Sequence, residues 1–199
     1  MLKKIHQVWI IILTIVCLVS IGKEHNVDFS QYITTKPVKL FSVMYGENMN
    51  NIGLYFEKLE ESEGGSTAIG ISDFAIDSKG NFYFADKVNG KIKKFNKKGE
   101  FIEATEDRLE SIESVTVDLQ GNIFVLYGNP STYIAVYDFK GKRKIFEENK
   151  INKILPKITF NYIFCDPLGN LYLFRDKYVD SEELYYKITP SFTKFEVYK

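Results

Sequence analysis

Three aspartates recur along the chain in one local pattern, and their carboxylates are the first groups to consider for chemistry. Asp77, Asp118 and Asp166 are separated by 41 and 48 residues, and each precedes two variable residues, a glycine and an asparagine. Carboxylates ligate Ca²⁺ and act as general acids or bases. An aspartate that ends a strand also accepts backbone N–H bonds across the following turn. Because this residue recurs in every repeat, we expect turn caps here, and neither metal ligands nor catalytic residues.

The glycine of each pattern supports this structural interpretation. Glycine adopts a positive φ without steric cost, as a tight turn between two strands requires. We assign nine residues to a structural turn motif: Asp77, Gly80, Asn81, Asp118, Gly121, Asn122, Asp166, Gly169 and Asn170.

Two further carboxylates and one thiol are secondary candidates. Asp86 and Asp176 end the second strand of their repeats, where burial would perturb a carboxyl group, and we favour a structural role for both. Cys165 lies in a Phe-Cys-Asp segment, which is typical of a small core residue rather than a reactive thiol. The other cysteine, Cys17, lies in the N-terminal segment, so we expect no disulfide among the repeats.

The placement of histidine limits the enzyme classes. His6 and His25 are the two histidines of the chain, and both precede the repeats. Zinc or copper sites built on histidine and nucleophile–base pairs are therefore excluded from the repeats. The sequence also lacks a Gly-x-Ser-x-Gly motif and a phosphate-binding loop. We expect a protein that is not an enzyme and that binds no cofactor.

The charge pattern gives no reason to expect a nucleic-acid partner. Basic and acidic residues number 26 each, without the basic excess that such binding needs. Strand alternation predicts that Lys91 and Lys93 face solvent, where lysines also discourage edge pairing. The one strong charge cluster consists of Lys87, Lys91, Lys93, Lys94, Lys97 and Lys98.

The elements that position these residues are short strands. Three segments have the same order of apolar residues, turn motif and apolar-aromatic strand: DFAIDSKGNFYFAD (73–86), SVTVDLQGNIFVLY (114–127) and YIFCDPLGNLYLFRD (162–176). Two more strands with turn signals between them follow each segment, and in the second repeat the last of these is expected at 143–147.

This order of strands and turns predicts an all-β fold. Repeats of this length, each with four short antiparallel strands, are typical of β-propeller blades. We expect a partial propeller of about three four-stranded blades, at about 71–105, 112–147 and 160–198, after an N-terminal hydrophobic signal or anchor helix.

The first repeat resembles the NHL family of propellers. The stretch ISDFAIDSKGNFYFADKVNGKIKKFNKKGEFI (71–102) carries the matching residues Asp77, Gly80, Asn81, Tyr83, Asp86, Asn89, Lys91, Ile92, Phe95 and Gly99. Upstream, VKLFSVMYGENMNNIGLYFEK (38–58) resembles the lead-in of secreted bacterial NHL-like propellers, including its Asn-Ile-Gly loop. The second repeat departs from the pattern, because Tyr127 replaces its second aspartate. The resemblance implies the fold and leaves the function open, since propellers host many functions.

The N-terminus carries a targeting signal. Lys3 and Lys4 precede an uncharged run from Val8 to Gly22, which is typical of a secretory signal peptide or a short membrane anchor. We therefore divide the chain into a signal or anchor at 1–22, a polar spacer at 23–37 and propeller blades at 38–199. Both alternatives export the blades, either to the extracellular space or to the cell envelope.

Three blades and a leading strand, expected at 38–45, do not close a ring. The family usually has about six blades, so the outer faces of the first and third blades should stay uncovered. We expect a protein partner, or a homodimer that closes a ring of six blades. The apolar side chains expected at these faces are Phe74, Ile76, Phe82, Phe84, Phe164, Leu171, Leu173 and Phe174.

The sequence therefore favours an exported, non-catalytic binding or scaffold module of the cell envelope. One alternative is the truncated remnant of a larger six-bladed propeller. A propeller enzyme of the lyase or lactonase type is a weaker alternative, because the usual histidine ligands are missing.

Overall fold

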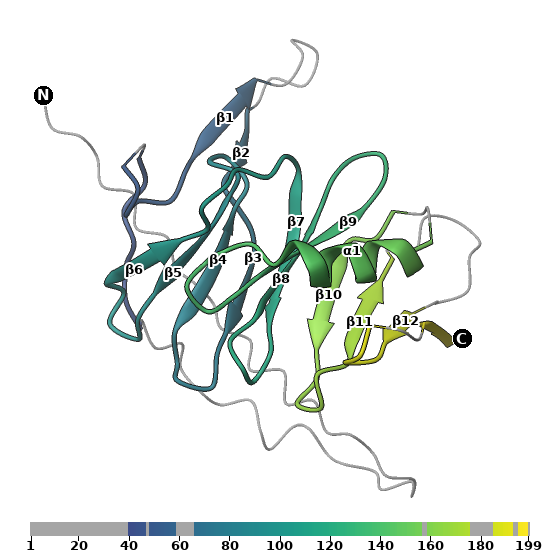
Figure 1. The fold of residues 1–199 in the computed structure, drawn as a ribbon. Coiled ribbons are helices and arrows are strands. Elements are labelled where there is room, and N and C mark those ends of the chain that lie inside the picture. Colours follow the sequence, from purple (N-terminus) through teal and green to yellow (C-terminus); the bar gives the residue numbers. More distant parts are fainter. Residues whose placement is uncertain are drawn as a thin grey trace, which may run out of the picture. The chain divides into compact units, whose positions relative to one another are not determined.

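The computed structural model describes residues 40–46, 48–58, 66–156, 159–175, 185–192 and 195–198. Its contacts divide the chain into two units, 1–42 and 43–199, and every strand and helix below belongs to the second unit. The described residues of that unit are nearly all β, with three antiparallel sheets, one hairpin and one short helix (Figure 1). The predicted fold class, all-β with about three propeller-like blades, is confirmed.

Blade 1 is a four-stranded meander in chain order. It consists of β3 (Ile71–Ile76), β4 (Phe82–Asp86), β5 (Lys91–Phe95) and β6 (Phe101–Ala104). Blade 3 repeats this order with β10 (Tyr162–Cys165), β11 (Leu171–Phe174), β12 (Tyr185–Ile188) and β13 (Phe195–Tyr198). Such local meanders form because tight turns bring consecutive alternating strands together.

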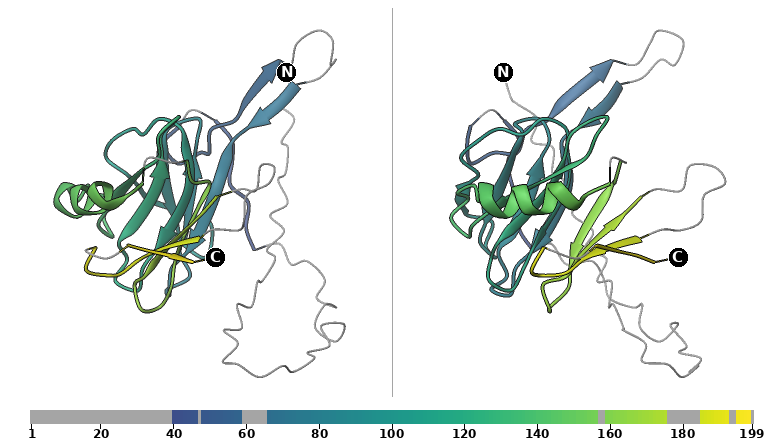
Figure 2. Two further views of the ribbon diagram at one scale, coloured as in Figure 1. Left: turned by 90° about the vertical axis from the view of Figure 1, so that its right-hand side faces the viewer. Right: turned by 45° about the vertical axis from the view of Figure 1, so that its right-hand side comes forward.

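Blade 2 has three strands, which corrects the expectation of four. It consists of β7 (Ile112–Val117), β8 (Ile123–Tyr127) and β9 (Tyr133–Tyr137). The strand expected at 143–147 is reduced to one bridge between Tyr137 and Arg143. The chain then forms the helix α1 (Ile145–Ile154), which lies against β9 (Figures 1 and 2).

One side chain of α1 takes over the pairing of the missing strand. Asn152 accepts a hydrogen bond from the backbone N–H of Ile134 at 2.9 Å and donates one to its C=O at 3.0 Å. The carboxamide thus mimics a peptide group at the open edge of β9. The face of α1 that includes Glu148 and Ile151, both buried, follows the three-to-four residue spacing of an amphipathic helix.

The region before blade 1 also differs from expectation. Residues 40–44 form no strand, and Tyr45 makes a single bridge to Ile52. Before blade 1, β1 (Tyr55–Lys58) and β2 (Ser66–Ile69) pair as an antiparallel hairpin. Residues 38–39, the spacer and the N-terminal signal lie outside the described residues, as does Asp176.

The hydrophobic core lies between the sheets. One cluster joins blades 1 and 2 and includes Tyr83, Ile92, Val125 and Tyr137. The other joins blade 2, blade 3 and α1, and includes Phe124, Ile151, Ile163, Leu171 and Leu173. Each buried apolar side chain of this size contributes about 1.5–3 kcal/mol relative to exposure, so stacking of the blades dominates the stability.

We predict that Asn152→Ala lowers the free energy of unfolding by about 1–3 kcal/mol, because both backbone groups of Ile134 lose their partner. Asn149→Ala is the matched control, since Asn149 lies exposed on the same helix and its loss should change stability by less than about 0.5 kcal/mol. Urea unfolding of the full chain, followed by circular dichroism, measures both. Equal losses would contradict the strand-mimicking role.

Candidate functional site

The turn motif is built around a carboxylate whose two oxygens are both engaged. In blade 1, Oδ1 of Asp77 accepts the backbone N–H groups of Lys79 and Asn81, each at 2.9 Å. Oδ2 accepts the side-chain amide of Asn81 at 2.8 Å and the hydroxyl of Tyr83 at 3.1 Å. The asparagine of the motif therefore closes the turn from both its backbone and its side chain.

The other two turns repeat this geometry, each in its own sheet, and Asp118 and Asp166 both lie close enough to the Cys165 thiol to help raise its pKa. Asp118 accepts the backbone and side-chain N–H groups of Asn122, and Asp166 accepts those of Asn170. The three motif glycines have φ between +80° and +84°, as expected. The expected turn after β9 has a related cap, in which Oδ1 of Asp138 accepts the backbone N–H groups of Lys140 and Lys142.

Titration of these groups follows from their surroundings. Burial alone would raise the pKa of Asp77, but the hydrogen bonds from Asn81, Tyr83 and Lys79 outweigh it and hold the pKa below its usual value. The pKa of Asp166 is lowered for the same reasons. Burial raises the pKa of the Cys165 thiol to about 12, so this cysteine stays protonated at neutral pH.

Asp86 and Lys93 form a buried ion pair, which corrects the expectation that Lys93 faces solvent. Their charged atoms lie 2.9 Å apart, with 0% and 1% of the side chains exposed. Alternation does place Lys93 on the face opposite Ile92 and Lys94, but that face is covered. Lys91 is half-buried and donates to the backbone carbonyls of Thr105 and Glu106. The lysine cluster is therefore partly structural.

The cover is the Asn-Ile-Gly loop at 51–53. The Nζ of Lys93 donates to the carbonyl of Asn51, and the N–H of Gly53 donates to Oδ2 of Asp86 at 2.9 Å. Between them, Ile52 is 1% exposed. A Cβ on residue 53 would lie within 2.7 Å of the Asp86 and Asn89 side chains, so only glycine fits here.

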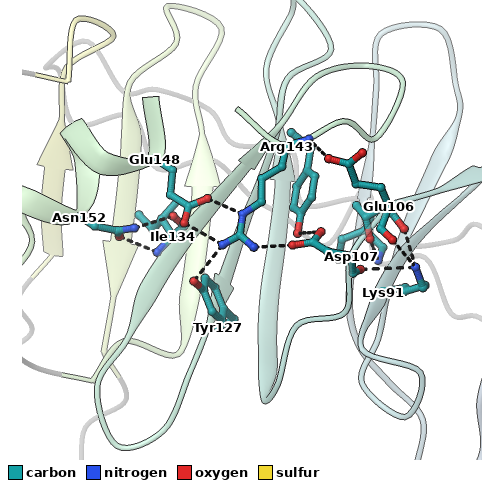
Figure 3. A network of polar contacts seen from close by, with 11 residues as sticks. Lys91, Glu106, Asp107, Tyr127, Ile134, Arg143, Glu148 and Asn152 are labelled. Atoms are coloured by element: carbon teal, nitrogen blue, oxygen red, sulfur yellow. Dashed lines mark hydrogen bonds and ion pairs between the residues drawn. The ribbon is translucent and has the colours of Figure 1, made fainter. Parts of the chain in front are cut away.

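A polar network joins the loop after β6 to α1 and β9 (Figure 3). Arg143 donates to both carboxylate oxygens of Glu148, at 2.8 Å each, and also to Asp107 and to the Tyr127 hydroxyl. Asp107 accepts the Tyr137 hydroxyl at 2.7 Å. The pKa of Arg143 is raised, first through its hydrogen bonds with Glu148. Because Nε and both terminal nitrogens are engaged, the guanidinium holds together the loop after β6, strand β8 and helix α1.

Blade 3 carries an exposed aromatic surface. We define the aromatic face as Tyr162, Phe164, Tyr172, Phe174 and Tyr185, which lie on the side of blade 3 away from the core. Neighbouring rings are 6.0–6.3 Å apart, and Lys187 lies 6.0 Å above the Tyr172 ring. Tyr162, Phe164 and Phe174 are 53%, 48% and 39% exposed.

The expected exposure of the two outer faces is therefore half right. Phe74 and Ile76 at blade 1 are exposed, together with Phe164 and Phe174 at blade 3. The other expected residues are buried: Phe82, Phe84, Leu171 and Leu173. In blade 3 the reason is strand parity, because Leu171 and Leu173 point to the core side.

The described residues contain no cluster of three or more histidine, cysteine or acidic side chains that could hold a metal ion. Among the same residues, no helix is long and apolar enough to cross a membrane.

No family model and no curated protein matches the chain, so the NHL resemblance stays an interpretation of the sequence. Solved structures are similar at low identity. Kuenenia stuttgartiensis hydrazine synthase has 10% identity and a TM-score of 0.47, covering 63% of this chain and 34% of that one. The extracellular domain of a putative hybrid two-component system from B. thetaiotaomicron has 15% identity and a TM-score of 0.42. The match covers 70% of this chain and 17% of that one. A Bacteroides caccae protein of unknown function has 15% identity and a TM-score of 0.40. The match covers 65% of this chain and 46% of that one. The chain spans less than half of each.

We predict that Asp77→Asn costs about 1 kcal/mol at pH 7, because the charged acceptor of the turn is lost. The folded pKa lies below the unfolded value of about 3.9, so Asp77 contributes stability above that value and loses it as pH falls through the folded pKa. Unfolding curves of the variant should therefore depend less on pH below about 4. Glu110→Gln, at an exposed carboxylate, should leave that dependence unchanged.

We predict that Lys93→Met destabilises the fold by about 3–5 kcal/mol, because Asp86 becomes a buried charge without its cation. The double variant Lys93→Met with Asp86→Asn should recover part of this loss. Lys97→Met, at an exposed lysine, is the control and should be nearly neutral. A Lys93→Met loss no larger than that of Lys97→Met would show that the pair does not hold the outer side of blade 1.

Proposed function

We propose that the chain is an exported, non-catalytic binding module of the cell envelope and that the aromatic face of blade 3 is its binding surface. The observation that carries the proposal is this face itself, where three of the five rings are 39–53% exposed. Exposed apolar patches on this scale mark interaction sites in soluble proteins, and tyrosine is enriched at interfaces.

The chemistry of the candidate residues supports a non-catalytic role. Asp77 and Asp166 have a lowered pKa, which makes them poor general acids at neutral pH. The Cys165 thiol is protonated and buried, so it is a poor nucleophile. Arg143 is held by two carboxylates of its own chain. Each group thus serves the fold.

Export is supported by the N-terminal sequence. Lys3 and Lys4 before an apolar run predict translocation of everything that follows, whether or not the segment is cleaved. Residues 1–22 then act as a signal or as the membrane tether of the module.

Cysteine labelling in cells tests both parts of the proposal. Phe164→Cys places a thiol on the aromatic face, and Phe146→Cys places one on α1, where Phe146 is 68% exposed. In spheroplasts that produce the full chain, a membrane-impermeant maleimide should label position 146. Position 164 should react more slowly than position 146, because a bound partner excludes the reagent.

The outcomes separate the two claims. Labelling of both positions only after lysis would overturn export. Equally fast labelling of both positions in spheroplasts would show a free aromatic face and overturn its role as the binding surface.

A further inference from the structure

The two blade junctions share one device, which we call the junction clamp. A short polar side chain on the first strand of one blade accepts a backbone N–H from the first strand of the next blade. Asp73 accepts from Val115 at 3.1 Å, Ser114 accepts from Ile163 at 3.1 Å, and Thr116 accepts from Cys165 at 3.1 Å. The clamp fixes how closely and in which register one blade stacks on another.

Blade 3 lacks the clamp on its own outward side. Strand register makes Asp73, Ser114 and Tyr162 equivalent, because each lies four residues before the aspartate of its turn motif. They oppose Ala85, Leu126 and Phe174, respectively. By the same register, Phe164 corresponds to Thr116. Phenylalanine has no acceptor, and the tyrosine hydroxyl lies at the far end of the ring. The aromatic face is therefore not built to receive a following blade in the way that blades 1 and 2 do.

Blade 1 is a poor partner for this face. A ring closed by two chains would place blade 3 of one chain on the outer side of blade 1 of the other. There the 51–53 loop is already seated, held by the buried Asp86–Lys93 pair. Ring closure would have to displace that loop and expose Ile52, which is 1% exposed.

Two side chains of opposite charge lie beside the aromatic face, so this surface is complementary in charge to the same surface of a second copy. Lys187 and Glu196 oppose each other on neighbouring strands, on the same side of the sheet as Tyr172. A two-fold axis that lies in the plane of the interface and runs midway between these two side chains, perpendicular to the line that joins them, would bring the lysine of each copy opposite the glutamate of the other. Isologous contacts of this kind are the commonest in homo-oligomers.

We propose that the occupant of the aromatic face is a second copy of this chain, related by a two-fold axis that stacks blade 3 on blade 3. The exposed ring area of roughly 300–400 Å² per copy is below the roughly 800 Å² of a stable interface, so the dimer is transient. The inference rests on the proposed function and names the partner of the same surface. It replaces the closed ring of six blades with an open pair.

Photo-crosslinking in cells tests the occupant. The full chain carries benzoylphenylalanine in place of Phe164, or in place of Phe146 on α1 as the matched control. Irradiation should yield a covalent product of twice the mass of the uncrosslinked exported chain from position 164, at least about fivefold above that from position 146. A product of another mass at position 164 would overturn the second copy and leave the binding surface standing. The absence of any product specific to position 164 would overturn the dimer.

Charge reversal tests the two-fold geometry. Chains with Lys187→Glu and chains with Glu196→Lys, carrying different tags, are produced separately and together with the crosslinker at position 164. Each variant alone should crosslink less than the unmodified chain, because like charges then meet. The mixed pair should exceed a random mixture roughly fivefold, as two exposed ion pairs predict. A purely structural role within one chain predicts a random mixture, and that result would overturn the two-fold arrangement.

Discussion

Burial on both sides of each sheet is the constraint on which this structure depends. Blade 2 is apolar on both faces, with Val125 toward blade 1 and Phe124 toward blade 3. A sheet of this kind is stable only between two covers, and the junction clamps set those covers in register. A loop of the chain, 51–53, meets this requirement over part of the outer side of blade 1, where Phe74 and Ile76 stay exposed. Among the described residues, blade 3 is covered on one side, and its other side is the surface that we assign to binding.

Much of the fold could be predicted from the sequence, because its strongest signals are local. Asp77, Gly80 and Asn81 define a turn through contacts within five residues, and the alternation of Phe82 to Phe84 defines the strand that follows. Local contacts recur wherever the motif recurs, so the three blades were found together. The helix α1 was not expected because the segment 143–147 follows a turn signal, at the place where the repeat order predicts a fourth strand. Its helical face becomes visible only when Glu148, Ile151 and Asn152 are considered with the edge of β9 that they cover.

The burial of Lys93 could not be predicted from strand alternation. Alternation tells which residues share a face, and it is silent about which face is covered. The cover of blade 1 comes from the 51–53 loop, 42 residues before Lys93, and no periodicity connects the two segments. The Asn-Ile-Gly sequence was noticed only as part of a family resemblance. Its close approach to Asp86, which leaves no room for a Cβ, is the physical reason for its glycine.

The loop at 51–53 also imposes an order of assembly on the chain. A polypeptide emerges from the ribosome with its N-terminal part first, so this loop is exposed before its binding partners exist. Asp86 and Lys93 must be synthesised, and β4 and β5 must pair, before the loop can dock. Until then both charges keep their hydration shells, and the phenylalanines of blade 1 lack their cover. The first blade is thus completed only when the earlier 51–53 loop docks on strands that are synthesised after it, once the local turns have formed.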